Sequence, residues 1–355
     1  MSSITPENAA LLKAKGDRIT SNGAYGLQNG TSVHRNEFGI DGGLFWSPNG
    51  TRLAYYEMNE ALVNGAGLTA PKFVDVGAEV KKAFDNPDKI IGYDYDTGYQ
   101  EQLYIEPQGM IGHCEEGQIT LVGSIQCPYY VKNAVISVLN SHEDYVRVKQ
   151  STVGGAFGGK EEFPSLLACH LAVAVNKINK PIKLIYEREE DMETTTKRHP
   201  AKIKLKAFIK DNEILGMESN VGIDAGAYIG LSGVVLSRAL IASTGAYTID
   251  NLEINGDVFI TNTVPNGAFR GFGAPQMLFA VEMFIHHIAK ELNLDALELR
   301  QKYLAKQNDA TSTGGEFRDP IIMPEMLEKV LKESIGKPLR FIETSLFGPE
   351  YRDNG

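Results

Sequence analysis

The periods of hydrophobic and polar positions predict that strands and helices alternate along most of this chain. A period of two marks the segments expected to be strands: Lys72–Val76, Lys89–Tyr95, Tyr99–Ile105, Gln118–Gly123, Tyr145–Lys149, Ile182–Tyr186, Ala201–Lys210 and Ile214–Asp224. A helical period marks the segments expected to be helices: Ala78–Phe84, Pro128–Leu139, Phe163–Val175, Met277–Leu292 and Asp295–Leu304. Elements of both kinds in this order predict an α+β fold.

Local signals between these segments refine the boundaries. The pair Asp211-Asn212 predicts a turn that joins two strands of a meander, and Asn293 is expected to cap the helix that follows it. The charged run Glu187–Asp191 predicts a solvated turn, because like charges repel unless water separates them.

His286 and His287 are adjacent, so on a helix they point about 100° apart and cannot easily ligate one metal.

The composition differs between Ser21 and Val63, where glycine, asparagine and aromatic residues alternate. Within it the run Trp46–Tyr55 (WSPNGTRLAY) predicts a strand, a tight turn and a second strand. Residues 21–63 resemble one propeller blade of the dipeptidyl peptidase IV-type serine peptidases. A single blade cannot bury its own faces, and the chain has no G-x-S-x-G nucleophile motif. Peptidase activity is therefore not expected.

We expect three regions along the chain. Residues 1–70 form an anomalous N-terminal segment of the β-hairpin or propeller-blade type, residues 71–335 form the main domain, and residues 336–355 form a tail without a usable motif. Poor packing of the hairpin on the main domain would leave four aromatic side chains exposed: Phe45, Trp46, Tyr55 and Tyr56.

Two glycine-rich loops carry the strongest chemical signal. The first, Gly154–Glu161 (GGAFGGKE), joins a predicted strand to a predicted helix. Such a turn aims free backbone N–H groups at an anion or an oxo group. The second, Asn266–Gln276 (NGAFRGFGAPQ), has the same glycine and phenylalanine character. Two loops of one kind predict a single site that is built from both sides.

Two other interpretations of the first loop compete with this one. Gly154, Gly159 and Lys160 fit the spacing of a nucleotide-phosphate loop, G-x-x-x-x-G-K. That motif needs a Ser or Thr hydroxyl next, and Glu161 would place a carboxylate beside the phosphates, so an NTPase is disfavoured. A tight turn without any ligand is the second alternative, and the presence of the second loop weakens it.

Composition and charge narrow the possible partners. The 355 residues are 43% hydrophobic and 23% charged, as in ordinary globular proteins. A net charge of −10 argues against a nucleic-acid or anionic-membrane partner. The three cysteines have no C-x-x-C spacing, so no disulfide, iron–sulfur or zinc framework is expected. Without an apolar signal segment or an 18-residue apolar run, a cytoplasmic location with reduced thiols is expected.

The two loops, the run Thr97–Gly112 (TGYQEQLYIEPQGMIG) and the RHP motif at 198–200 resemble the molybdenum hydroxylases. This family is typified by xanthine dehydrogenase and aldehyde oxidoreductase, and the resemblance spans about residues 75–335. Spacing strengthens it. Gln126 precedes the Glu of the first loop by 35 positions (161 − 126), and Arg238 precedes the Arg of the second loop by 32 (270 − 238), as in the family. The histidine of RHP is expected to be structural.

The resemblance implies a cofactor and the residues around it. The cofactor would be a molybdopterin-bound molybdenum that the protein does not ligate directly, so positioning falls to second-shell groups. Gln126 would donate its side-chain amide to the apical oxo group, and Phe157 and Gly158 would present backbone N–H groups to the same region. Arg270 would contact the cofactor and orient it.

Substrate residues are implied in the same way. Glu161 and Arg238 would hydrogen-bond to a planar heterocycle while Phe272 stacks on it. Independently of the family, Arg238 is the lone charge in a stretch of small residues and needs a partner or an anion. Family members that act on purines resemble one another in this Glu and Arg pair. We therefore expect hydroxylation of a purine or related azaheterocycle with water as oxygen source, with an aldehyde oxidoreductase as the more remote alternative.

The chain also departs from the family pattern. The general-base glutamate of the family lies in a late G-x-G-E type segment that is not present before Gly355. We therefore expect an incomplete portion of an enzyme, whose [2Fe–2S] and FAD groups reside on partner subunits or missing domains, with a dimer as one expected assembly. The alternative is a chimaeric or truncated fragment that binds no cofactor and has no catalytic activity.

Overall fold

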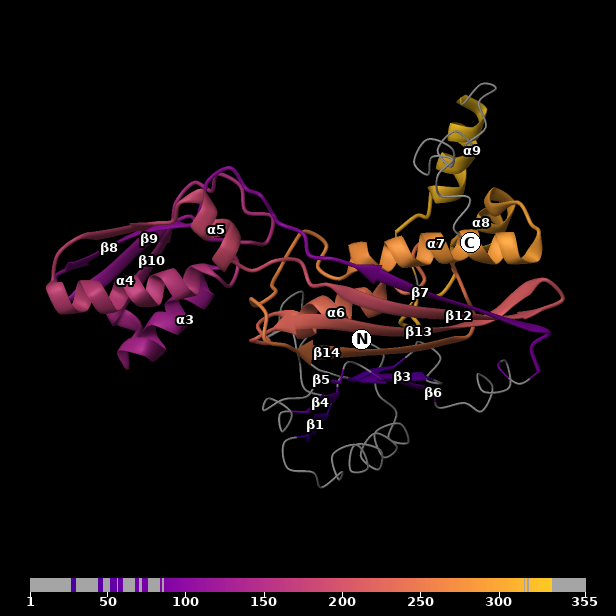
Figure 1. Ribbon diagram of the computed structural model, residues 1–355, viewed down its shortest axis with the longest axis horizontal. Coiled ribbons are helices and arrows are strands. Elements are labelled where there is room, and N and C mark those ends of the chain that lie inside the picture. Colours follow the sequence, from indigo (N-terminus) through magenta and orange to yellow (C-terminus); the bar gives the residue numbers. More distant parts are fainter. Residues whose placement is uncertain are drawn as a thin grey trace.

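The computed structural model describes residues 84, 86–315, 317 and 319–333, and the backbone of six short strands nearer the N-terminus. Those strands are β1 (Leu27–Asn29), β2 (Leu44–Trp46), β3 (Arg52–Tyr55), β4 (Glu57–Asn59), β5 (Leu68–Thr69) and β6 (Lys72–Asp75). Figure 1 shows two lobes side by side, each with its own sheet and its own helices. Helices and sheets are mixed in both lobes, as the α+β prediction requires.

The larger lobe contains a five-stranded sheet of order β5-β14-β13-β12-β7. Its long strands are β7 (Lys89–Thr97), β12 (Ala201–Lys210), β13 (Glu213–Gly226) and β14 (Leu252–Ile260). Strand β12 pairs antiparallel with both β7 and β13, whereas β13 and β14 run parallel. Along β12, Ile203 and Leu205 are buried and the intervening lysines are exposed. The alternation therefore buries one face of the sheet.

Helices α6 (Ser232–Ile241) and α7 (Ala274–Leu292) pack on the buried face of this sheet and on each other. Their apolar residues, including Leu240 and Phe284, form one core with the inward side chains of β12, β13 and β14. Helix α8 (Ala296–Tyr303) packs against α7. Helix α9 (Met323–Glu333) projects away from the lobe and has no buried residue (Figure 1).

The smaller lobe contains a four-stranded sheet of order β10-β9-β8-β11. Its elements are β8 (Gly109–Glu115), β9 (Gln118–Gly123), α3 (Pro128–Leu139), β10 (Val146–Gln150), α4 (Pro164–Ile178), β11 (Ile182–Ile185) and α5 (Arg188–Thr194). Strand β10 runs parallel to β9, and the other pairs are antiparallel. Helices α3 and α4 cover one face (Figure 1), where Leu121, Val131 and Leu171 are buried together.

Two short segments connect the lobes. Residues 98–108 run from β7 to β8, and residues 195–200 run from α5 to β12. The first of these was predicted to be a strand over Tyr99–Ile105, and this prediction is wrong because the segment has no regular structure. Its backbone pairs with no described strand, and its side chains form hydrogen bonds with both lobes. Strand β8 was not predicted.

Two further predictions, the solvated turn at Glu187–Asp191 and the cap at Asn293, are wrong. In each case an aspartate forms hydrogen bonds that the sequence did not indicate. The run Glu187–Asp191 is not a solvated turn: it enters helix α5, and Asp191 is fully buried, where it accepts hydrogen bonds from Tyr104 Oη and Gln108 N, both at 2.6 Å. Asn293 does not cap α8. It ends α7 in the left-handed region, and Asp295 caps α8 through the N–H groups of residues 297 and 298.

The N-terminal strands agree with the predicted hairpin as far as their backbone is described. Strands β2 and β3 pair antiparallel, and β6 adds to β3. Strand β5 pairs with β14 at the edge of the main sheet, although it precedes the predicted boundary at residue 70. The predicted exposure of the hairpin aromatics, most of the predicted helix 78–84 and the predicted tail 336–355 lie outside the described residues. No helix in the described part is long and apolar enough to cross a membrane.

Candidate functional site

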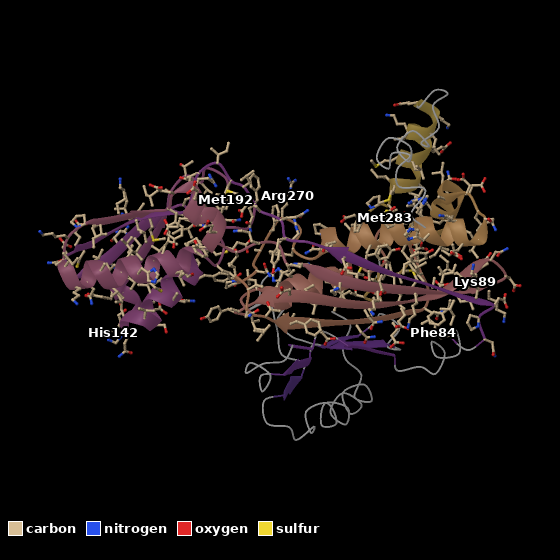
Figure 2. All side chains as sticks on the ribbon, viewed as in Figure 1. Phe84, Lys89, His142, Met192, Arg270 and Met283 are labelled. Carbon is tan, nitrogen blue, oxygen red and sulfur yellow. The ribbon has the colours of Figure 1, made fainter. Side chains whose placement is uncertain are left out.

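The two glycine-rich loops meet where the lobes join. Arg270 N–H donates to Phe157 O at 2.9 Å, so the backbones of the loops are in direct contact. Figure 2 shows Arg270 at the junction of the two lobes. A Cβ added to Gly158, whose φ is 103°, would lie 2.5 Å from Ala268 O, which is too close for any other residue. The predicted convergence of the two loops is confirmed.

The loops also share an unusual backbone conformation. Phe157 (φ 53°) and Phe272 (φ 51°) both occupy the left-handed region, which large side chains seldom adopt. Each is next to a glycine with positive φ, Gly158 at 103° and Gly271 at 85°. Strain of this kind costs about 1–3 kcal/mol per residue and persists where the surroundings enforce it, often at functional sites. The close contact between the loops is such an enforcing environment.

Gln126 ties the first loop to the end of β9. Its Oε1 accepts hydrogen bonds from the N–H groups of Gly158 (3.0 Å) and Lys160 (3.2 Å), and its own N–H donates to Lys160 O (2.8 Å). Within the described part of the chain, Gln126 Nε2 and Phe157 N–H have no protein acceptor. The side-chain amide is thus oriented to donate outward, while the N–H of Gly158, predicted to face a cofactor, is used by Gln126 instead.

Lys160 anchors the first loop from inside the protein. Its side chain is fully buried, and its ammonium lies 2.9 Å from Glu106 Oε2 and 3.0 Å from Ser124 Oγ. Glu106 Oε2 also accepts the N–H of Gly154 at 2.7 Å. Burial raises the pKa of Glu106, but its hydrogen bonds with Lys160, Ser124 and Gly154 outweigh this and lower the pKa overall. Lys160 is therefore a structural cation and not a phosphate ligand, which removes the nucleotide-loop alternative.

Arg198 of the RHP motif holds the second loop, a role that the sequence did not reveal. Its guanidinium is buried and donates to Phe272 O (2.9 Å) and Arg270 O (3.0 Å), with Phe269 stacked at 4.1 Å. Its Nε donates to Gln100 Oε1 at 2.6 Å. Burial lowers the pKa of Arg198. The planar guanidinium of Arg198 donates from two nitrogens to two carbonyls of one loop at the same time, which the single ammonium of a lysine could not do in this geometry.

The neighbouring His199 is structural, as predicted. Its Nε2 lies 2.7 Å from Ser232 Oγ at the start of α6, and its ring is fully buried. Burial lowers the pKa of His199 to about 4, so the ring is neutral at physiological pH. Gln276 also donates to the His199 carbonyl, at 3.1 Å. The motif thus links β12, α6 and α7 beneath the second loop.

The substrate-side residues Glu161 and Arg238 lie at the end of the first loop and on α6. Glu161 and Arg238 are both half-buried. Arg238 occupies the last turn of α6, and a Cβ on Gly273 of the second loop would clash with residues 235 and 239 of the same helix. Glu162, next to Glu161, reaches the segment before α6, where its Oε1 would lie 2.5 Å from a Cβ on Gly230. The second loop therefore packs on the helix that carries Arg238, and the residue after the first loop reaches the segment that precedes this helix.

Phe272 has a different environment from the one predicted for a residue that stacks freely on a substrate. It is half-buried and packs against the core of the larger lobe. Phe157, its counterpart in the first loop, has 49% of its surface exposed. Arg270 is exposed as well. The exposed groups at the loop junction are thus Gln126, Phe157 and Arg270.

Comparison with known proteins agrees with this geometry. The molybdopterin cofactor-binding domain family matches residues 68–304, and the dipeptidyl peptidase IV N-terminal region matches residues 9–76. The chain is 32% identical to a xanthine dehydrogenase of Dictyostelium discoideum over 279 residues, which are 77% of this chain and 20% of that protein. It is 29% identical to the nicotinate dehydrogenase large molybdopterin subunit of Eubacterium barkeri, over 79% of this chain and 66% of that protein.

Solved structures show the same fold. The aldehyde oxidoreductase of Desulfovibrio gigas superposes with a TM-score of 0.67 at 26% identity, over 76% of this chain and 29% of that one. The quinoline 2-oxidoreductase of Pseudomonas putida 86 has a TM-score of 0.65 at 22% identity, over 78% of this chain and 36% of that one. The chain therefore has the fold of the molybdopterin-binding domain of the molybdenum hydroxylases. The chain belongs to the molybdopterin cofactor-binding domain family.

The described residues fit the molybdopterin cofactor of this family. The outward donor of Gln126, the free N–H of Phe157 and the exposed guanidinium of Arg270 are hydrogen-bond donors, which suit the oxo and phosphate oxygens of such a group. The glycine backbone lets the two loops approach until a Cβ no longer fits between them. The chain spans 20% of the xanthine dehydrogenase and 66% of the nicotinate dehydrogenase subunit that it resembles.

Proposed function

We propose that this chain provides the molybdopterin-binding portion of an enzyme that hydroxylates a purine or related azaheterocycle, with water as the oxygen source. The observation that carries the proposal is the pair Glu161 and Arg238. The two side chains have opposite charge and are half-buried: Glu161 ends the first glycine loop, and Arg238 lies on α6, against which Gly273 of the second loop packs. Such a pair suits a ring with N–H and C=O edges better than an apolar aldehyde.

The names of several relatives support a heterocyclic substrate. A nicotinate hydroxylase of Emericella nidulans is 30% identical over 277 residues, covering 77% of this chain and 20% of that protein. With the nicotinate dehydrogenase subunit and xanthine dehydrogenase, three relatives are thus named for nitrogen heterocycles. An aldehyde oxidase of Mus musculus is 32% identical over 283 residues, and its name supports an aldehyde as the competing substrate class.

In the proposed site, the bound molybdenum cofactor supplies the redox chemistry and the activated water. Gln126 donates its Nε2 to the cofactor, and Arg270 fixes its orientation. Glu161 accepts from a ring N–H, Arg238 donates to a ring carbonyl or nitrogen, and Phe272 forms part of the wall against which the ring lies. The role of these residues is to bind and orient both groups.

The proposed enzyme needs further domains or subunits that carry electrons away from the site. Electrons leaving the site require [2Fe–2S] and FAD groups on partner subunits or on further domains, in a dimeric assembly. The relative named as a large molybdopterin subunit supports a multi-subunit arrangement.

Within this chain, the proposal divides the sequence into three regions. Residues 1–70 are a separate segment, residues 71–335 are the molybdopterin-binding domain and residues 336–355 are a tail. The match of residues 9–76 to an unrelated peptidase region supports the competing proposal, a chimaera that binds no cofactor.

Gln126→Glu is expected to reduce the molybdenum content of the purified chain about tenfold or more while leaving its thermal unfolding nearly unchanged. The variant keeps an oxygen for the N–H groups of Gly158 and Lys160 but replaces the outward donor by a carboxylate oxygen. Metal analysis and pterin fluorescence measure the loss. Equal contents in both proteins would contradict the role of Gln126, and an absence of molybdenum in the unmodified chain would favour the chimaera.

Arg238→Met is expected to reduce kcat/KM for hypoxanthine or xanthine about tenfold, because a buried polar edge of the ring loses its partner. The assay uses the assembled enzyme and compares these purines and nicotinate with benzaldehyde, whose turnover should not fall. Arg147→Met, at an exposed position of β10, is the matched control. Faster turnover of benzaldehyde by the unmodified enzyme, or unchanged purine turnover in the variant, would reject the proposed substrate class.

A further inference from the structure

The connection between the lobes, residues 98–108, touches both glycine loops from behind. Gln108 Nε2 donates to Gly159 O at 2.7 Å, and Glu106 bonds the N–H of Gly154 and Lys160 Nζ, so one end of the connection holds the first loop. At its other end, Gln100 accepts from Arg198 Nε. Since Arg198 in turn bonds two carbonyls of the second loop, the connection reaches both loops.

Gln102 of this segment bonds the second loop and lies beside the first. It is 5% exposed, and its Nε2 donates to Ala268 O at 2.9 Å. This carbonyl is also the atom nearest to the Cβ position of Gly158. On its other side, Gln102 Cδ lies 3.2 Å from the Cβ position of Gly159. The side-chain amide therefore lies between Ala268 of the second loop, which it bonds, and Gly159 of the first loop.

We propose that Gln102 is a positioning residue that sets the distance and register between the two glycine loops. The hydrogen bond from its Nε2 orients the Ala268 carbonyl, against which Gly158 packs. That carbonyl lies two residues before Arg270, whose N–H bonds to Phe157. Gln102 thus acts on the exposed groups Phe157 and Arg270 through the loops that carry them, without touching either group.

The chemistry of the position demands an amide of this length. Methionine would fill the same volume but leave Ala268 O buried without its donor, and an unsatisfied buried carbonyl is costly. Glutamate would place an acceptor against that carbonyl, and asparagine would fall one methylene short. Gln102 Oε1, in contrast, has no hydrogen-bond partner among the described residues. The donor end of the side chain is the part that the loops use.

The test compares Gln102→Met with Gln118→Met. Gln118 also donates its side-chain amide to a backbone carbonyl, Asp144 O at 2.6 Å, but at the far edge of the smaller lobe. Amide hydrogen exchange is followed by mass spectrometry on the full chain. In Gln102→Met, exchange should accelerate about tenfold in residues 154–160 and 267–273, with α3 and α4 unchanged. In Gln118→Met these two loop segments should exchange as in the unmodified protein.

Two outcomes would overturn the inference. The first is unchanged exchange of both loop segments in Gln102→Met. The second is acceleration of equal size in α3 and α4, which would show that the residue serves general stability only. Gln102→Glu provides an independent variant, expected to accelerate exchange in the same two segments because it also lacks the donor.

A second measurement connects this inference to cofactor binding and rests on the proposed function. If the chain binds molybdopterin, Gln102→Met should retain several-fold less molybdenum than Gln118→Met at equal protein concentration. Retention equal in the two variants would overturn the link to the cofactor. If the unmodified chain holds no molybdenum, the proposed function fails, while the hydrogen-exchange result still decides the role of Gln102.

Discussion

Gly158→Ala is expected to destabilise the protein by about 2–5 kcal/mol and to abolish molybdopterin binding. Two costs add together. The alanine must adopt a φ of 103°, and its Cβ would lie 2.5 Å from Ala268 O and 2.7 Å from Ala268 C. Relief requires the loops to separate, which also breaks the contact between Phe157 O and Arg270 N–H. Urea unfolding and metal analysis measure the two effects.

Gly117→Ala is the matched control for this prediction. Gly117 also has a positive φ, 79°, but nothing lies within 4 Å of its Cβ position, in the turn between β8 and β9. Its substitution should cost only the backbone strain, about 1–2 kcal/mol, and leave molybdenum content unchanged. A Gly158→Ala protein that is no less stable than Gly117→Ala would show that the loops can separate freely, contrary to the contact described.

Lys160→Met is expected to cost about 3 kcal/mol at neutral pH, because it removes a buried ammonium from two partners at once. Glu106 and Ser124 both bond to this group, and Glu106 in turn holds the N–H of Gly154. The variant should therefore also lose cofactor by loosening the first loop. Lys206→Met is the control, because its ion pair with Glu218 lies at the surface and should be worth less than about 1 kcal/mol.

The pH dependence of this effect separates the ion pair from simple packing. The pKa of Glu106 is lowered in the folded protein, so its stabilising contribution is present above the unfolded pKa of about 4.3 and is lost as pH falls through the folded value. The difference in unfolding free energy between the unmodified protein and Lys160→Met should be largest near pH 7 and shrink at about pH 3. A difference that is constant over this range would assign the effect to packing alone.

Local signals in the sequence were sufficient for many of the regular elements, although not for β8, β14 or α6, and for the meeting of the loops. Helix α3 has the bounds that were predicted from its period and from Pro128. The two Gly and Phe loops were expected to form one site, and the Arg270 N–H to Phe157 O hydrogen bond joins them. These predictions succeed because period, turn chemistry and the torsional freedom of glycine act within a few residues, where the sequence records them directly.

The partners of the buried polar groups could be known only from the tertiary structure. Asp191 resembled a solvated charge and is buried against Tyr104, and Gln102 resembled part of a strand but donates to Ala268, which lies 166 positions away. The side chain of Lys160 likewise finds Glu106 at a separation of 54 positions. Sequence shows which residues are polar. Whether a polar side chain is hydrated or buried depends on which distant backbone approaches it, and desolvation then makes one specific partner necessary.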